Sequence, residues 1–221
     1  MADKLITADA AAKLIQDGMT VMIGGFMSNG TPEILIDALL KKGVKELTVI
    51  GNDSGTPGTG IGRLVAAGAV RKLIASHIGL NPLTGQLMNE GKIEVNLVPQ
   101  GTLAEQIRAG GAGLGGVLIP TGLGTEVAAG KEIVTVEGRA YLLEKPLKAD
   151  AALIRASVAD HAGNLFYKGT TRNFNPLMAT AAELVIAAAQ ELVPVGAMTP
   201  EHVVTPAILV DYLVGGEPPC Q

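Results

Sequence analysis

Short apolar runs alternate with longer helical patterns from the first residues of the chain. Residues 8–16 have the spacing of a helix that ends at Gly18, and residues 20–23 form an apolar run typical of a strand covered on both faces. Residues 32–40 repeat the pattern of an amphipathic helix. Further runs of strand length lie at residues 47–50, 70–75, 93–98, 116–119 and 151–156. Strands separated by helices predict βαβ units and a mainly parallel sheet.

Two regions depart from this alternation. Residues 132–136 and 139–143 flank Glu137-Gly138, a hairpin turn signal, so we expect a small antiparallel addition to the sheet. Near the end of the chain, residues 182–189 and 208–214 are apolar in a way that fits either a helix or a strand. We interpret the first of these two segments as a strand.

The composition indicates one domain over residues 1–221. A chain of 221 residues with 48% hydrophobic content can bury one substantial core, and no low-complexity stretch suggests a linker. A net charge of -4 without a basic stripe argues against nucleic acid as a partner. The N-terminal residues lack a signal pattern, and no apolar run reaches the roughly 18 residues of a membrane helix. We therefore expect a cytoplasmic protein without a membrane partner.

The apolar run at residues 20–23 leads into Gly24-Gly25 and, after Gly30, into a helix start at Thr31-Pro32. Thr31 can cap this helix, and Pro32 suits its first turn. A glycine loop before a helix N-terminus directs free N–H groups at one point, which suits phosphate or pyrophosphate. The glycines could equally serve only to turn the chain. No lysine completes a P-loop, so ATP or GTP hydrolysis is not indicated.

Two neutral amide side chains follow two of the predicted strands. Asn52 comes directly after residues 47–50, and Gln100 follows residues 93–98. Ligands of open α/β sheets bind at the carboxyl ends of the strands. An amide N–H placed there can stabilise a developing oxyanion, although a single Asn or Gln in such a position is more often a turn residue.

A second glycine run does not have the context of a nucleotide site. Residues 111–116 satisfy G-x-G-x-x-G, but that fingerprint must follow a strand and open a helix. Here we expect a helix before the run, with Thr102-x-x-Glu105 as its capping box, and a strand after it. A helix-to-strand turn that allows close approach of another backbone or a ligand is the better interpretation.

Reactive side chains do not gather in a familiar arrangement. His77, His161 and His202 lack metal-ligand spacing, so we expect no metal site, and no G-x-S-x-G nucleophile elbow occurs. The single cysteine, Cys220, excludes an internal disulfide, and its place behind two prolines indicates an inert residue. Arg172 could bind an anion, although an ion pair or a helix cap is the commoner role.

Residues 17–32 resemble the signature of the class I coenzyme A transferases, which consists of Asp-Gly, an apolar strand, Gly-Gly-Phe and Gly-x-Pro. The similarity covers nearly the whole chain. It continues through Gly51-Asn52-Asp53, Pro99-Gln100-Gly101-Thr102-Leu103, residues 110–116 and Arg172-Asn173-Phe174-Asn175-Pro176. The chain is most similar in this pattern to the alpha subunits of two-chain acetate or acetoacetate transferases.

The resemblance implies a three-layer α/β/α fold with a mainly parallel sheet, as in ribose-phosphate isomerase. It also implies an enzyme that moves coenzyme A, as a substrate, between short-chain acids such as acetate, butyrate and acetoacetate, without a permanently bound cofactor. The ping-pong mechanism of the family passes through a glutamyl-CoA thioester. None of this chain's glutamates is followed by the family's Asn-Gly, so we expect the nucleophile on a partner beta subunit, in an α2β2 assembly.

Two positions match active-site motifs of the family. Asn52 and Gln100 are expected to orient carboxyl groups or to stabilise their oxyanions. The resemblance also implies a coenzyme A and acyl pocket lined by Gly24, Gly25, Phe26, Met27, Ser28, Asn29 and Gly30.

Two alternative functions are compatible with the same fold. A sugar-phosphate isomerase would need an acid-base carboxylate and phosphate-binding cations, for which Asp53 and Arg63 are the best pair in the sequence. A non-catalytic ligand-binding module would usually carry a DNA-binding segment, and a chain with 17 basic residues and no basic stripe shows none.

Overall fold

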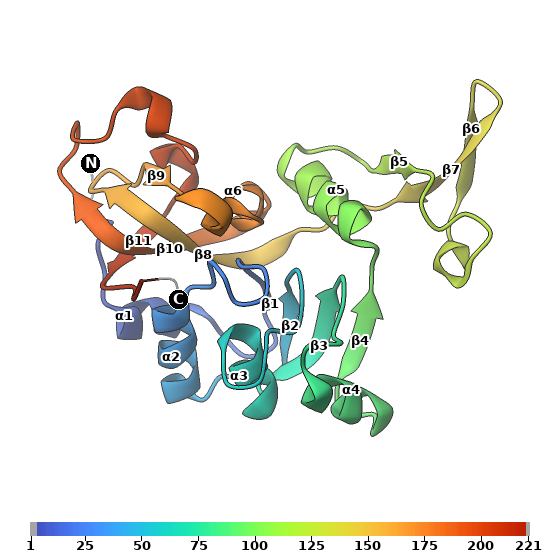
Figure 1. The fold of residues 1–221 in the computed structure, drawn as a ribbon, viewed down its shortest axis with the longest axis horizontal. Helices are drawn as coiled ribbons and strands as arrows, with labels where there is room; N and C mark the ends of the chain where they lie inside the picture. The colour runs from blue at the N-terminus through green and yellow to red at the C-terminus, as the bar shows by residue number, and fades with distance from the viewer. Residues whose placement is uncertain (1–3, 220–221) are drawn as a thin grey trace.

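A parallel β-sheet forms the centre of the protein. The computed structural model describes residues 4–219, and its main sheet has the strand order β11-β10-β8-β1-β2-β3-β4 (Figure 1). These strands are β1 (Thr20–Ile23), β2 (Leu47–Ile50), β3 (Val70–Ala75), β4 (Glu94–Leu97), β8 (Ala149–Asp160), β10 (Ala182–Val193) and β11 (Tyr212–Gly215). Every neighbouring pair in this order is parallel, and β9 (Leu165–Phe166) adds an antiparallel pairing to β8. The predicted parallel sheet is confirmed, and residues 182–189 lie in a strand as interpreted. Residues 116–119 are the exception, because their strand lies outside this sheet.

Helices cover both faces of the main sheet. They are α1 (Ala8–Leu14), α2 (Glu33–Lys42), α3 (Gly60–Ala66), α4 (Pro82–Asn89), α5 (Gln100–Gly111) and α6 (Asn175–Met178). Alternate residues of β1 point into different cores, since Val21 packs with α1 to α3 and Met22 packs with α5 and α6. Two cores separated by one sheet make the three-layer α/β/α fold that the sequence predicted.

The hairpin at Glu137-Gly138 is confirmed, but it belongs to a separate sheet. Strand β6 (Ile133–Val136) pairs with β7 (Arg139–Glu144), and β7 also pairs with β5 (Val117–Ile119), all antiparallel. Figure 1 shows this three-stranded sheet beyond α5, apart from the main sheet. Buried Glu144 connects the two parts, because it accepts a hydrogen bond from Gln106 Nε2 of α5 at 2.9 Å and pairs with Lys131 at 2.6 Å.

Several local expectations are corrected. Helix α5 begins at Gln100, so Thr102 lies buried inside its first turn and is not the residue of a capping box. Residues 208–214 begin in a 3₁₀ turn (Ala207–Leu209) and end in β11. Short helices α3 and α4 were not predicted, because both contain glycine and α3 follows a segment rich in turn residues. Cys220 lies outside the described residues.

None of the helices within residues 4–219 has the length and apolar character that crossing a membrane requires.

Candidate functional site

The two predicted amide side chains meet at the carboxyl end of the sheet. Asn52 follows β2, and Gln100 opens α5 after β4, 48 positions further along the sequence. The Nε2 atom of Gln100 donates a hydrogen bond to Oδ1 of Asn52 at 2.7 Å. Their contact follows from the parallel sheet, which brings the ends of its strands to one edge.

Asn52 and Gln100 differ in their access to solvent. Asn52 is 1% exposed, and its Nδ2 donates to Oδ2 of buried Asp53 at 2.7 Å. Gln100 is exposed. Of the two predicted site residues, only Gln100 can therefore contact a ligand directly in this structure, while Asn52 contacts Gln100 from behind.

Gln100 faces a surface pocket of about 350 Å³ with mainly apolar walls. The pocket is lined by Phe26, Gln100, Gly101, Ala104, Asn173, Phe174 and Leu177. These residues come from the glycine loop, from the first half of α5, and from α6 with the two residues before it. An amide donor beside an apolar wall suits a ligand with a polar carbonyl end and a short hydrocarbon part.

A second pocket of about 490 Å³ shares Asn173 and Leu177 with the first. Its lining includes two arginines, Arg108 and Arg172, and Gly111 of the second glycine run. Arg172, the candidate anion-binding residue of the sequence, therefore lies in the wall of this second pocket, next to the pocket of Gln100.

The glycine loop after β1 contains a tight, strained turn. Phe26 and Asn29 exchange two backbone hydrogen bonds of 3.0 and 2.9 Å. Between them, Met27 and Ser28 have φ angles of +49° and +65°, a conformation that is uncommon for residues with a side chain. The turn leaves Phe26 37% and Met27 50% exposed. Such strain is maintained at functional sites when the surroundings hold it in place.

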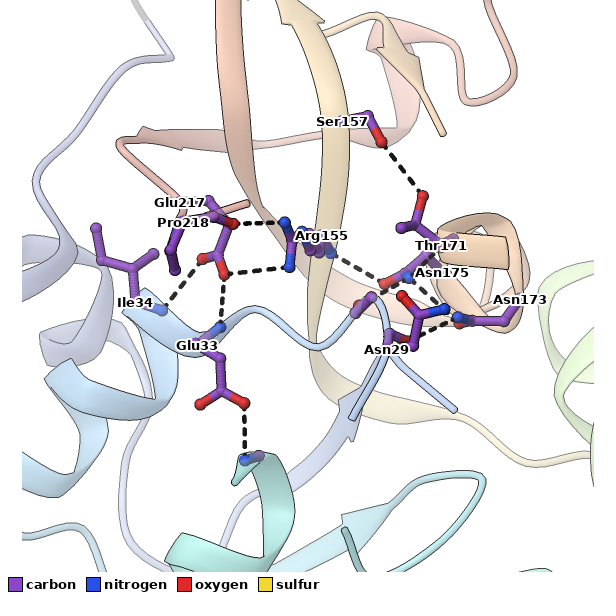
Figure 2. A network of polar contacts seen from close by, with 12 residues as sticks. Asn29, Glu33, Ile34, Arg155, Ser157, Thr171, Asn173, Asn175, Glu217 and Pro218 are labelled. Atoms are coloured by element: carbon purple, nitrogen blue, oxygen red, sulfur yellow. Dashed lines mark hydrogen bonds and ion pairs between the residues drawn. The ribbon is translucent and has the colours of Figure 1, made fainter. Parts of the chain in front are cut away.

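Asn175 packs directly against this loop. The sequence placed it in a motif shared with the class I coenzyme A transferases but gave it no role. A Cβ on Gly24 would lie 1.8 Å from Oδ1 of Asn175, so only glycine fits there. Asn175 Nδ2 donates to the carbonyl oxygens of Gly30 at 3.0 Å and Thr171 at 2.8 Å, and its Oδ1 accepts from the backbone N–H of Arg155 (Figure 2). The motif of residues 172–176 was the signal in the sequence that could have pointed to this role.

The predicted anion site at the helix N-terminus is occupied by the chain itself. Glu217 accepts hydrogen bonds from the backbone N–H groups of Glu33 at 2.9 Å and Ile34 at 3.1 Å, at the start of α2 (Figure 2). The N-cap residue is Pro32, and Thr31 does not cap the helix. Of the two interpretations that the sequence left open, the phosphate cradle does not hold at the start of α2, because a buried carboxylate already satisfies these donors.

Arg155 of β8 is the charged partner of Glu217. Its Nη1 lies 3.8 Å from Oε1 of Glu217, with the two side chains 3% and 0% exposed, and its Nη2 donates to the carbonyl oxygen of Pro218. Residues 217 and 218 are thus fixed against α2 and the centre of the sheet.

Burial raises the pKa of Glu217 from its ordinary value of 4.5 to about 7, although the N–H groups of Ile34 and Glu33 and the Arg155 guanidinium oppose this shift. Glu217 therefore binds a proton more tightly in the folded chain than in the unfolded one. Its proton-linked stabilisation is complete below pH 4.5 and is lost as the pH rises through about 7.

We therefore expect the stability difference between the wild type and Glu217→Gln to change with pH. The free energy of unfolding of the wild type, relative to the variant, should fall between pH 4.5 and about 7 and stay level above that range. Urea unfolding at a series of pH values measures this difference. A difference that is constant over the whole range would contradict the assignment to Glu217.

The residue pair of the isomerase alternative is not formed. Arg63 pairs with Glu33 at 3.2 Å and with Asp37, while Asp53 accepts hydrogen bonds at the end of β2. Within residues 4–219, no three His, Cys, Asp or Glu side chains gather as metal ligands. His77 lies beside Asp53 through a parallel β-bridge, and its Nδ1 is 3.2 Å from the Ser76 hydroxyl.

Comparison with known proteins gives consistent matches over nearly the whole chain. Residues 4–216 match the model of a protein family described as "Coenzyme A transferase". "Acetate CoA-transferase subunit alpha" of Escherichia coli (strain K12) is 54% identical over 214 residues, which cover 97% of both chains. "Acetoacetyl-CoA:acetate/butyrate CoA transferase alpha subunit" of Clostridium acetobutylicum is 52% identical, over 97% of this chain and 98% of that one.

Among solved structures, an acyl-CoA transferase from Escherichia coli O157:H7, in a thioester complex with CoA, has a similar fold. Its TM-score is 0.85 at 24% sequence identity. The match covers 99% of this chain but only 50% of the solved one, so the present chain corresponds in length to half of that protein.

Proposed function

This chain belongs to the coenzyme A transferase family, and on that premise we propose that it is the alpha subunit of a two-chain acyl-CoA:carboxylate CoA-transferase. The enzyme exchanges coenzyme A between short-chain acids such as acetate, butyrate and acetoacetate. The acids named for the two similar alpha subunits support this substrate class. The pocket of about 350 Å³ beside Gln100 is of a size for a short acyl group.

One observation carries the assignment of this chain as half of an active site. Among the described residues, the lining of the Gln100 pocket offers an amide donor and apolar walls but no carboxylate, hydroxyl or thiol that could act as a nucleophile. Covalent catalysis at this pocket therefore needs a nucleophile from elsewhere. We assign that role to a glutamate of a beta subunit, in an α2β2 assembly.

In the proposed mechanism, the partner's glutamate attacks the thioester carbonyl of the acyl-CoA, the C–S bond breaks, and CoA leaves as a thiolate. An acyl-glutamyl anhydride remains. The thiolate then attacks the glutamyl carbonyl and releases the first acid as a carboxylate, which leaves a glutamyl-CoA thioester. The second acid repeats these steps in reverse, so the overall exchange is divided into acyl transfers with lower barriers.

This chain's residues stabilise the charge that these steps create. Each attack converts a carbonyl oxygen into an oxyanion. We assign the donation to this oxyanion to the N–H of Gln100 that does not bind Asn52. Residues 24–30 are proposed to border the bound coenzyme A and acyl group, with Phe26 as the part that lines the pocket. The single domain and the cytoplasmic location stay predictions of the sequence.

Co-expression with a candidate beta subunit tests the proposal. The purified complex is incubated with acyl-CoA and treated with borohydride, which reduces a glutamyl thioester to an alcohol. Mass spectrometry of the peptides then locates the modified glutamate. We expect CoA exchange by the complex and a reduced glutamate on the partner chain. A modified glutamate on the present chain, or an active homo-oligomer without a partner, would contradict the assignment.

A further inference from the structure

Asp53 connects the glycine loop with the loop that follows β2. The side chain is 4% exposed. Its Oδ2 accepts hydrogen bonds from the backbone N–H of Met27 at 2.8 Å and from Nδ2 of Asn52 at 2.7 Å. Its Oδ1 accepts from the backbone N–H of Gly55 at 2.8 Å. The carboxylate is thus bound to the glycine loop, to the side chain that contacts Gln100, and to the loop after β2.

The chemistry of the carboxylate determines how the two amides are oriented. An ionised carboxylate only accepts hydrogen bonds, so Asn52 must direct its NH₂ group toward Asp53. Oδ1 of Asn52 consequently faces Gln100 and accepts from Nε2 at 2.7 Å, and it also lies 3.3 Å from the Ser76 hydroxyl. Of the two ends of the Gln100 amide, only the NH₂ group can donate a hydrogen bond to this oxygen. The second N–H of that NH₂ group is then free to donate to a ligand.

We propose that Asp53 is a positioning residue that acts through Asn52 to hold the amide of Gln100 with its N–H groups toward the reacting carbonyl. The inference rests on the proposed function, because it gives Gln100 the role of oxyanion donor. It assigns a purpose to a buried carboxylate that does not contact the pocket. Without Asp53, the amide of Asn52 can rotate by half a turn, and Gln100 can then present its carbonyl oxygen, which repels an oxyanion.

The isosteric variant Asp53→Asn in the assembled enzyme tests this relay. In this variant an NH₂ group replaces one of the two carboxylate oxygens. It then faces either the N–H of Gly55, or the N–H of Met27 and the NH₂ group of Asn52. Two donors cannot form a hydrogen bond, so the orientation of Asn52 is no longer fixed. We expect kcat to fall roughly ten- to hundredfold through misplacement of Gln100. The hydrogen bond from Met27 holds the glycine loop, which is proposed to border the bound coenzyme A. Loss of this bond should therefore raise the KM for acyl-CoA.

Asp160 offers a matched control. It is 3% exposed and accepts hydrogen bonds from three backbone N–H groups and from an asparagine side chain, Nδ2 of Asn164 at 2.8 Å. Asp160→Asn therefore removes the same kind of buried acceptor at the end of β8, without contact to Asn52 or Gln100. We expect Asp160→Asn and Asp53→Asn both to lower the thermal midpoint of unfolding, and Asp160→Asn to leave kcat unchanged.

A double-mutant cycle on kcat separates positioning from a merely structural role. If Asp53 acts through Gln100, Asp53→Asn combined with Gln100→Ala should be no slower than Gln100→Ala alone. The proposal would be overturned if the double variant lost kcat by the product of the two single losses. It would also be overturned if Asp53→Asn left kcat unchanged. If Asp53→Asn does not assemble, Asn52→Ala replaces it in the cycle, because this variant breaks the relay and leaves the backbone bonds of Asp53 intact.

The controls also separate this inference from the proposed function. A wild-type complex without CoA exchange, or a fully active Gln100→Ala, would contradict the proposed function itself. An active wild type, an impaired Gln100→Ala and an unaffected Asp53→Asn would contradict only the role of Asp53.

Discussion

Gln100→Ala is expected to lower the kcat of the assembled enzyme by about a hundredfold or more, the usual effect of removing one oxyanion donor. The side chain reaches the apolar pocket, and one N–H is held by Asn52 at 2.7 Å while the other is available to a ligand. Because this donor acts mainly on charge that develops in the transition state, kcat should fall much more than KM rises. Steady-state kinetics of CoA exchange measure both constants.

Two further variants make this result specific. Gln100→Glu keeps the shape of the side chain but replaces the donor with an acceptor, so it should lose at least as much activity as Gln100→Ala. Gln86→Ala removes an exposed glutamine from α4 that donates to Glu90 at 2.8 Å, and it should retain full activity. An undiminished kcat in Gln100→Ala would remove this residue from the site.

Arg155→Met is expected to cause the largest loss of stability, about 3–5 kcal/mol at pH 8, because it leaves the Glu217 carboxylate buried without its cation. Methionine has a similar length and fills most of the same space. The loss should be smaller at pH 6, because Glu217, with its pKa raised to about 7, is then largely protonated and leaves little unpaired charge. The midpoint of urea unfolding measures the change, at a fixed protein concentration because subunit assembly shifts the midpoint.

Removal of both charges should restore part of this stability. Arg155→Met combined with Glu217→Gln leaves no unpaired charge, so it should be more stable than Arg155→Met alone. The exposed Arg71, 3.9 Å from Glu46, provides a control, and Arg71→Met should change stability by no more than about 1 kcal/mol. Equal losses of stability in Arg155→Met and Arg71→Met would contradict the expected contribution of the buried Arg155–Glu217 pair.

The expected positions of the first strands were correct because their signals are local. Residues 20–23, 47–50 and 70–75 form β1, β2 and β3 with the predicted bounds, since each is a short apolar run between turn residues. The hairpin at Glu137-Gly138 was predicted for the same reason. The turn requires positive φ at both positions, and the structure has +51° and +77°.

Errors arose where a local signal had more than one meaning. Thr102 and Glu105 have the spacing of a capping box, but α5 starts two residues earlier and buries Thr102. Helix α3 contains two glycines, which lower helix propensity, and its burial in the core compensates for this. Tertiary packing contributes more to such helices than propensity does.

The sequence by itself determined the alternation of strands and helices, the glycine loop, and the family to which its motifs belong. Only the tertiary structure decided which polar groups meet. Gln100 meets Asn52 across 48 positions, Asn175 reaches Gly30 across 145, and Glu217 caps α2 across 184. These contacts depend on the order of parallel strands and on burial of the side chains between them. Because no local pattern encodes that order, the sequence indicated a phosphate at the start of α2 where the folded chain places its own carboxylate.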